Sequence, residues 1–584
     1  MFIAMERHEH TEITTKNPYV NTLFLKFIFH LFSRNITFLN CLSTIKSWLI
    51  YNICFCKAVV FTLGLVFSYK LAEKVIVSVF ITYLTEYYDL RKAAAYANLE
   101  EGLSKLLVFF LIYISKVFSD HFVMIIFCLI VTYTSGMVIF ALTVSDVFPM
   151  SLFDLLSITG LILVAVGRAG LIPFIRGFAV DQLITHEPDL QDIDVERVIA
   201  REETWWRVAW GVSSLVAIPL FNTSWTLRFR ISASVMAMAF IVFVLGKRFY
   251  HKRESSSAAT PFTTIRVIKS ALLNWHIQYP SPPDRFFTED ENNTSETTEL
   301  WPQVKWLRWL DKAAVIESTL EQNQQIREGR LFSVTEVQET KYILKMVPMW
   351  CAFPMFGLVL SAGNTFFAEQ AMDLEFPGHL IYLILLQSIS RETVSSLSTL
   401  LLSIWYLDEA KQKQNMVRIW AGMLVSILCC TVASRVEAHR LHVVAENELL
   451  DYPFKTIPMS IWWLAPQFCL LGLMDGLATG GLEDFTNDED HLSLPMKNFL
   501  TAINGFVVTG IGSALNIIFI YQNTKYFGST LNLSRLDLYY QSFAYYVPTL
   551  NCAYLLMISI TIYRCSAVAQ VNSSQSQIIV ADVA

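Results

Sequence analysis

The sequence has few charged residues for its length. Asp, Glu, Lys and Arg make up 16% of the 584 residues, whereas soluble domains carry roughly 25%. Hydrophobic residues account for 54% of the chain and aromatic residues for 14%. A soluble protein is therefore disfavoured, and the composition predicts a membrane protein that lies in a lipid bilayer.

The sequence also lacks an excess of positive charge. Its formal net charge of −6 argues against a nucleic-acid-binding protein, which would present a basic face. The 10 cysteines are scattered, and Cys54 and Cys56 lack the second pair that a zinc site needs. We interpret the cysteines as small buried hydrophobic residues.

Motifs of common enzymes are absent from the sequence as well. We find no nucleotide-binding P-loop, no HExxH zinc motif and no GxSxG nucleophile elbow. A carrier of small solutes needs neither a nucleophile nor a cofactor. We therefore expect a protein that is not an enzyme and that holds no cofactor and no metal ion.

From Val59 onward the sequence contains twelve apolar stretches. Each could cross a bilayer, which takes about 20 mostly apolar residues. They are 59–85, 98–118, 121–144, 151–175, 202–222, 228–248, 345–370, 378–406, 414–436, 458–480, 496–522 and 540–563. A long polar segment separates the first six from the last six. This pattern predicts an all-α membrane protein with twelve transmembrane helices in two six-helix bundles.

The expected domains follow from this count. They are an N-terminal segment of uncertain status (1–58), a first bundle (59–248), a cytosolic linker (249–344), a second bundle (345–563) and a cytosolic tail (564–584). Segment 1–58 is apolar but broken by charges, and it lacks the cleavage site of a signal peptide. Basic residues after the sixth stretch and around 411–418 place those loops in the cytosol.

The linker contains one amphipathic stretch, Leu300–Ile316. Two interpretations are open for it. It could lie on the membrane surface, with Trp301, Trp306 and Trp309 near the lipid headgroups. It could equally be an ordinary loop helix.

Five further stretches resemble motifs of the plant nitrate/peptide transporter family. This family is the plant branch of the proton-dependent oligopeptide transporters in the major facilitator superfamily. The stretches are GRAGLIPFIRGFAVDQL, WLRWLDKAAVIE, FSVTEVQETKYILKMVPMW, PMSIWWLAPQFCLLGLMDGLATGGLEDF and LNLSRLDLYY. They occur in the expected order within 59–563. The resemblance implies the major facilitator fold, with a central substrate site and alternating access.

The first span contains three charges, Lys70, Glu73 and Lys74. The resemblance places them on the family's proton-coupling motif ExxER, which has become KxxEK here. Because a lone lysine in the bilayer costs about 2.5–3.5 kcal/mol, we expect pairing on the helix face that the three residues share. Two interpretations are open: Glu73 is the remaining protonatable carboxylate, or the coupling site has decayed into an internal salt bridge.

The resemblance suggests further site residues. Ile172 stands where the family's fourth span has a lysine, and Arg168 lies one turn earlier. Arg168 could attract an anion, or it could pair with Asp154 or another buried acid. The remaining candidates are Asp475 for proton coupling, Ser361, Asn364 and Gln467 for the substrate cavity, and Asp120 for gating. For Asp475, a tight helix contact at the neighbouring glycines is the competing account.

These observations predict a secondary transporter whose partners are protons and a small solute. A more positive cavity favours nitrate or another small anion, and a di- or tripeptide is the alternative substrate. A carrier fold that no longer couples to protons, acting as a facilitator or a sensor, is the other alternative. The expected location is the plasma membrane or the vacuolar membrane. The sequence carries no indication of an oligomeric state.

Overall fold

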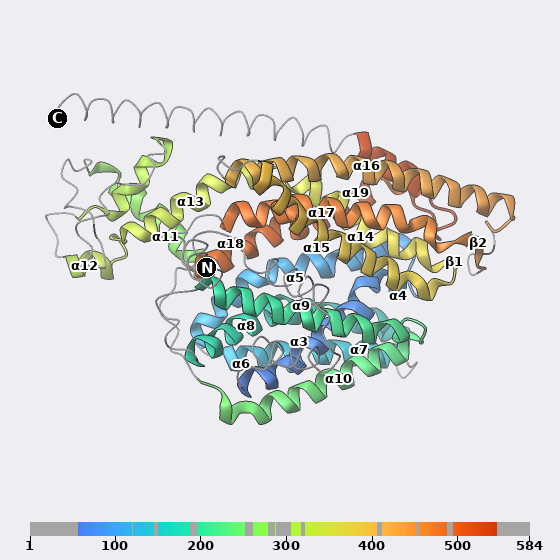
Figure 1. Cartoon of the computed structure of the whole chain (residues 1–584), viewed down its shortest axis with the longest axis horizontal. Coiled ribbons are helices and arrows are strands. Elements are labelled where there is room, and N and C mark those ends of the chain that lie inside the picture. The colour runs from blue at the N-terminus through green and yellow to red at the C-terminus, as the bar shows by residue number, and fades with distance from the viewer. Residues whose placement is uncertain are drawn as a thin grey trace, which may run out of the picture. The chain divides into compact units, whose positions relative to one another are not determined.

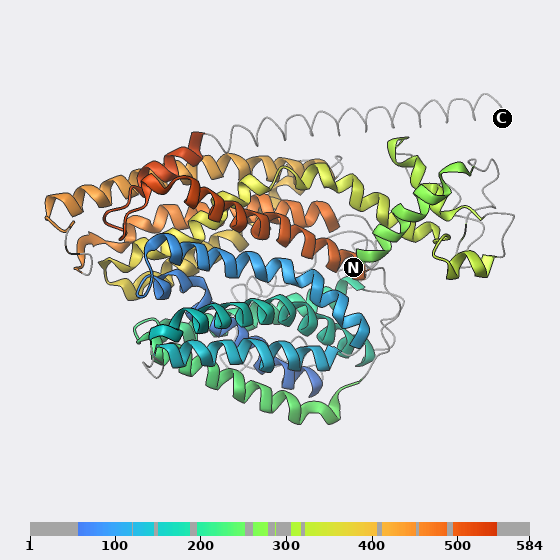
Figure 2. The same ribbon diagram turned by 180° about the vertical axis from the view of Figure 1, so that it is seen from behind.

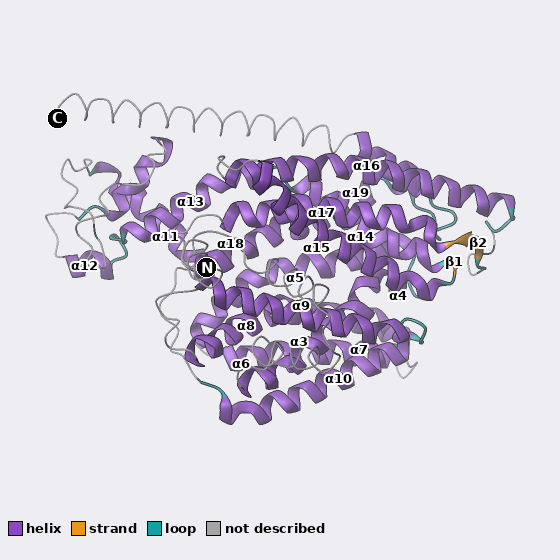
Figure 3. Ribbon diagram, viewed as in Figure 1, coloured by secondary structure: helices purple, strands orange, loops and turns teal. Residues whose placement is uncertain are grey.

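A computed structural model describes the chain from residue 57 to residue 545 with several gaps. The described residues are 57–118, 121–144, 150–186, 195–251, 261–277, 287, 305–316, 322–405, 411–450, 452, 455–487 and 494–545. Almost all of them are helical (Figure 3). Most of the N-terminal segment 1–58, most of the predicted stretch 540–563 and the tail 564–584 lie outside these residues.

Helices occur at eleven of the twelve predicted stretches, and at the twelfth residues 536–545 are helical (Figure 1). They are α3 (Lys57–Val75) with α4 (Phe80–Leu84), α5 (Leu90–Phe118), α6 (His121–Ile126) with the π-helix η2 (Phe127–Thr134) and α7 (Ser135–Thr143), α8 (Met150–His186), α9 (Val195–Leu220), α10 (Trp225–Leu245), α13 (Val334–Trp350) with α14 (Pro354–Met372), α15 (Leu380–Trp405), α16 (Lys411–Glu446), α17 (Ala465–Asn487), and α18 (Leu494–Gly505) with the π-helix η11 (Phe506–Gly510) and α19 (Ile511–Gln522).

By length and hydropathy, six helices in the described part of the chain can cross a membrane, or seven if α13 and α14 form one bent span. The predicted class, a helical membrane protein, is therefore confirmed. The predicted number of twelve spans is not confirmed.

The chain forms two compact units. The first contains the described residues of Met1–Val77, Asp120–Pro149 and Leu171–Arg253. The second contains those of Ser78–Ser119, Met150–Gly170 and Glu254–Ala584. Helix α8 contributes to both units. The division into six-helix bundles at 59–248 and 345–563 stays a prediction.

In the first unit, α3 packs against α9 and α10. Helix α10 shows why these helices suit a lipid environment. One face buries Phe229, Met236 and Phe243, whereas Met238 and Leu245 on another face are each 68% exposed. A helix that is apolar all round is typical of a membrane span, because its outer face can contact lipid.

In the second unit, α14 packs against α19, and α17 lies between α15 and α16 (Figures 1 and 2). Glycines allow these helices to approach closely. A Cβ atom on Gly472 or Gly476 of α17 would overlap the carbonyl oxygen of Gln387 or Arg391 of α15. Small residues at such contacts are typical of packed membrane helices.

Helix α13 begins at a capping box. The Ser333 hydroxyl accepts a hydrogen bond from the Glu336 backbone N–H (3.3 Å), and the Glu336 carboxylate accepts one from the Ser333 N–H (3.0 Å). Helix α13 ends at Trp350, and α14 begins at Pro354 after a bend of 64°. Proline suits this position because its missing N–H would have no partner in a first turn.

The linker folds into a small cluster with α13. Its elements are α11 (Pro261–Leu273), η5 (Asn274–His276), the 3₁₀ helix η8 (Lys305–Ala314) and α12 (Gln322–Arg327). Leu307 and Leu310 of η8 pack with Val267 of α11 and Val337 of α13. The apolar side of this stretch therefore faces protein, as the loop-helix interpretation expects. Trp309 packs against the same cluster, and Trp301 and the Trp306 side chain lie outside the described residues.

Two short strands join loops of the second unit. Strand β1 (Leu374–Glu375) follows α14 and pairs in parallel with β2 (Ile457–Ser460), which precedes α17. Short 3₁₀ turns complete the described part: η1 (Val77–Val79), η4 (Gly246–Phe249), η9 (Pro377–His379), η10 (Ile461–Leu464) and η12 (Thr524–Tyr526).

We predict that Gly472→Leu destabilises the second unit by about 1–3 kcal/mol, because the side chain must displace the α15 backbone. Thermal unfolding of the purified protein in detergent measures the effect. Gly211→Leu in α9 is the matched control, since nothing lies within 4 Å of a Cβ there. An equal melting temperature for the two variants would contradict the α15–α17 contact.

Candidate functional site

The predicted pair on the first span forms. The Lys70 Nζ atom lies 2.7 Å from the Glu73 Oε2 atom, one helical turn along α3. Lys74 is 7% exposed, and its Nζ atom lies 5.3 Å from the centre of the Trp210 ring of α9. The single carboxylate of this helix turn is therefore accompanied by two lysines. Whether it takes up a proton during transport stays a prediction.

A third cation joins this group. The Arg176 guanidinium of α8 lies 5.2 Å from the centre of the Trp206 ring, and the Lys70 Nζ atom lies 5.8 Å from the same ring. Cations are attracted to the face of an indole. We call Lys70, Glu73, Lys74 and Arg176 the cationic cluster. It carries three positive charges and one negative charge.

Sequence reasoning missed Arg176, although a signal for it was present. It lies four residues after Ile172, where the resemblance leads one to expect a lysine, so both positions share a face of α8.

Arg168 lies in the second unit and pairs with acids of α5. Its Nη1 atom donates to Glu100 Oε2 at 2.6 Å and to Glu101 Oε2 at 2.9 Å. Arg168 therefore pairs with a buried acid, and whether it also attracts an anion stays a prediction. Asp154 is not that acid, because its Oδ1 atom accepts a hydrogen bond from the Tyr88 hydroxyl at 2.8 Å.

Asp475 lies on α17 and pairs with α15. Its Oδ2 atom is 3.1 Å from the Arg391 Nε atom, and its side chain is 12% exposed. Gly472 and Gly476, which flank it, form the close contact with the same helix. Asp475 thus combines a charge with a tight helix contact. A role in proton coupling stays a prediction.

The predicted polar residues of the cavity contact other helices. Ser361 of α14 is buried, and its hydroxyl lies 3.1 Å from the Ser513 hydroxyl of α19. Asn364 is exposed, and its Oδ1 atom accepts a hydrogen bond from Gln387 at 2.9 Å. Whether either residue contacts a substrate stays a prediction. Asp120, the gating candidate, lies outside the described residues.

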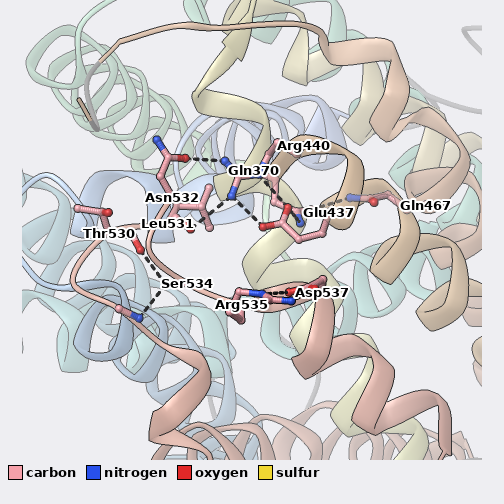
Figure 4. A network of polar contacts seen from close by, with 11 residues as sticks. Gln370, Glu437, Arg440, Gln467, Thr530, Leu531, Asn532, Ser534, Arg535 and Asp537 are labelled. Carbon is pink, nitrogen blue, oxygen red and sulfur yellow. Dashed lines mark hydrogen bonds and ion pairs between the residues drawn. The ribbon is translucent and has the colours of Figure 1, made fainter. Parts of the chain in front are cut away.

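Gln467 belongs to a buried network that sequence reasoning missed (Figure 4). Its Nε2 atom donates to Gln370 Oε1 at 2.8 Å, and Gln370 donates to Glu437 at 2.7 Å. Glu437 forms an ion pair with Arg440, and both side chains are 0% exposed. An acid and a base three residues apart inside an apolar helix were the signal for this pair.

Arg440 extends the network to the loop before the last described helix. Its Nη1 atom donates to Asn532 Oδ1 at 2.7 Å, and its Nη2 atom donates to the Leu531 carbonyl at 3.3 Å. The network therefore links α14, α16 and α17 to this loop. Because each of the three guanidinium nitrogens donates at least one hydrogen bond, we interpret the network as a structural lock.

Buried amides connect further helices of the second unit. Asn98 of α5 donates to the Thr365 hydroxyl of α14 at 3.1 Å, and it accepts from Asn516 of α19 at 3.1 Å. The Tyr539 hydroxyl donates to Asn516 at 2.8 Å. Among the described residues, no group of three or more His, Cys, Asp or Glu side chains could hold a metal ion.

Comparison with known proteins shows several similarities. A family model described as PTR2, POT family, matches residues 123–532. The Arabidopsis thaliana protein NRT1/PTR FAMILY 5.5 is 30% identical over 366 residues, which cover 60% of this chain and 67% of that protein. NRT1/PTR FAMILY 5.6 from the same plant is 26% identical over 549 residues, which cover 86% of this chain and 90% of that protein.

Solved structures share the fold. A crystal structure of an auto-inhibited POT family peptide transporter matches with a TM-score of 0.55 and 15% identity, covering 85% of this chain and 96% of that chain. The POT family transporter PepTSo matches with a TM-score of 0.53 and 15% identity. The match covers 86% of this chain and 98% of that chain.

We predict that Arg440→Met destabilises the protein by about 3–5 kcal/mol, because it leaves the Glu437 carboxylate buried without its cation. Thermal unfolding in detergent measures this loss. Arg435→Met on the exposed side of the same helix is the control and should have little effect. The double variant Glu437→Gln/Arg440→Met should recover part of the stability; no recovery would contradict the charge-pair explanation.

A second prediction concerns Asp373, which follows α14 outside the membrane-spanning segments. Burial raises the pKa of this carboxyl from 3.8 to about 6, with Arg440 opposing the rise and Glu437 adding to it. The folded state therefore binds this proton more tightly than the unfolded state does. As a result, the free energy of unfolding falls as the pH rises from about 4 to about 6. Asp373→Asn removes this loss.

The Asp373→Asn variant should therefore melt at a higher temperature than the unaltered protein at neutral pH, and this advantage should vanish towards pH 4. Melting curves across this pH range check it. Glu375→Gln, an exposed neighbour, is the control. A constant difference at every pH would contradict the raised pKa of Asp373.

Proposed function

The chain belongs to the POT family, and we propose that it is a secondary active transporter that moves a small solute together with protons by alternating access. The membrane-spanning helices support this proposal, as do the similarities to solved transporters of the same fold. Such a carrier uses charged and polar side chains inside the membrane to bind its solute and coupling ions.

The proposed substrate is nitrate or a comparable small anion. The observation that carries this choice is the cationic cluster, in which Lys70, Lys74 and Arg176 outnumber Glu73. Cations attract an anion more strongly where water is scarce. The Lys70 side chain is 19% exposed and Lys74 is 7% exposed, whereas Arg176 is exposed. The aromatic rings of Trp206 and Trp210 lie against two of the cations, Arg176 and Lys74, at 5.2 Å and 5.3 Å.

A di- or tripeptide fits this arrangement less well. A peptide carries a positive amino terminus, which needs a carboxylate partner. Glu73 already pairs with Lys70 at 2.7 Å, and Asp475 pairs with Arg391 at 3.1 Å. Binding the amino terminus at Glu73 or at Asp475 would require that pair to open.

A facilitator without proton coupling is the second candidate function. The specific observation in its favour is the Lys70–Glu73 pair, since the carboxylate already has a cation 2.7 Å away as its partner. In this case the cationic cluster would bind the anion, and uptake would follow the gradient of the anion alone.

Uptake in oocytes tests the proposal. We expect uptake of isotope-labelled nitrate that increases when the external medium is acidified, and little uptake of a labelled dipeptide. Uptake of the dipeptide alone would favour the peptide alternative. Nitrate uptake that is indifferent to pH would favour the facilitator. No uptake of either probe at normal surface abundance would contradict a transporter of these substrates.

Removing one cation tests the assigned site. Arg176→Gln should lower nitrate uptake roughly tenfold or more, because a charge-assisted hydrogen bond contributes about 1.5–3 kcal/mol. Arg248→Gln is the matched control, since Arg248 is exposed in η4 of the same unit. Uptake and surface abundance are measured together. Equal uptake in both variants would show that Arg176 does not contact the anion.

A further inference from the structure

Glu100 of α5 is a buried acid with an unsatisfied oxygen. Its side chain is 3% exposed, and its Oε2 atom accepts the hydrogen bond from Arg168 at 2.6 Å. The other oxygen, Oε1, is buried without a hydrogen-bond partner. A bare carboxylate oxygen is costly in a medium of low polarity, and binding a proton removes the charge that makes it costly.

A second carboxylate lies beside it and competes for the same cation. One nitrogen of Arg168, Nη1, donates to both Glu100 and Glu101. Two carboxylates held by one nitrogen repel each other, and one proton on the pair relieves this repulsion. Lys105 offsets part of the charge on Glu101, since its Nζ atom lies 4.0 Å from the Glu101 Oε1 atom.

Glu101, the partly exposed member of the pair, lies away from the apolar face of α5. The exposed apolar residues Leu99, Leu106 and Phe110 mark one face of this helix. Glu101 and Lys105, which are 29% and 34% exposed, lie on the opposite face. The partly exposed residues Glu101 and Lys105 are therefore turned away from the apolar face of α5 that suits lipid.

The other elements that pack extensively against α5 contain few charged residues. Helices α4 and α19 and the π-helix η11 contain no Asp, Glu, Lys, Arg or His. Glu369 of α14 and Lys497 of α18 are the charged residues of the remaining two helices. The charges that act on Glu100 come from Arg168, Glu101 and Lys105.

We propose that Glu100 and Glu101 form the proton-binding site of this transporter, with Arg168 as the positioning residue that holds both carboxylates. In the uptake step a proton binds the free Oε1 atom of Glu100, and the Oε2 atom keeps its bond to Arg168. This proposal rests on the proposed proton-coupled function. It assigns proton binding to α5 and α8, and leaves the cationic cluster, whose one carboxylate already faces two lysines, to the anion.

Infrared spectroscopy tests proton binding without any substrate. The full chain is purified and reconstituted in lipid. Its infrared difference spectrum between acidic and neutral pH is then recorded. We expect a band from protonated carboxyl groups that loses intensity in Glu100→Gln and in the milder variant Glu101→Gln. Glu73→Gln and the exposed control Glu328→Gln should keep the full band. A full band in both Glu100→Gln and Glu101→Gln would overturn the proposal.

Nitrate uptake in oocytes gives the functional counterpart. The ratio of uptake at acidic and neutral external pH should fall to about one in Glu100→Gln and stay unchanged in Glu328→Gln. The reverse result, with the ratio lost only in Glu73→Gln, would return proton coupling to α3 and overturn the proposal. If no probe is transported, the proposed function fails, while the infrared measurement still decides whether the pair binds a proton.

Discussion

The constraint on which this structure depends is that a charge inside an apolar helix must have a partner. An isolated charge in the bilayer costs several kcal/mol, and three ion pairs in the described part of the chain illustrate this constraint. Lys70 lies against Glu73, Arg168 against Glu100, and Arg440 against Glu437. Of the three, the Arg168–Glu100 pair joins two helices, α8 and α5, whereas the other two pairs lie within α3 and within α16.

The three pairs differ in their balance of charge, and this difference suggests different roles. Glu73 has two lysines beside it, so the surplus is positive and suits an anion. Glu100 and Glu101 share one guanidinium nitrogen, and the Oε1 atom of Glu100 is buried without a hydrogen-bond donor, which suits a proton. Glu437 and Arg440 balance each other, and amide and carbonyl groups satisfy them fully, which suits a fixed structural contact.

Interactions between neighbours along one helix could be predicted from the sequence. The spacing of Lys70 and Glu73 predicted their pair, because residues three apart share a face of a helix. The same rule would have found Glu437 and Arg440. The Arg168–Glu100 contact spans 68 positions, and no local spacing identifies such a partner. For Arg168 the sequence left two roles open, and packing of α8 beside α5 selected pairing with an acid.

The sequence by itself determined the helical membrane class, the positions of most helices and the family, because hydrophobic length and motif order are properties of the chain. Tertiary structure alone decided which charges on different helices meet. It brought Arg176 to the tryptophan that Lys70 faces, gave Asp475 the partner Arg391, and turned the linker's apolar side towards protein. Charge balance depends on distances of a few ångström between different helices, and such distances exist only after the helices have packed.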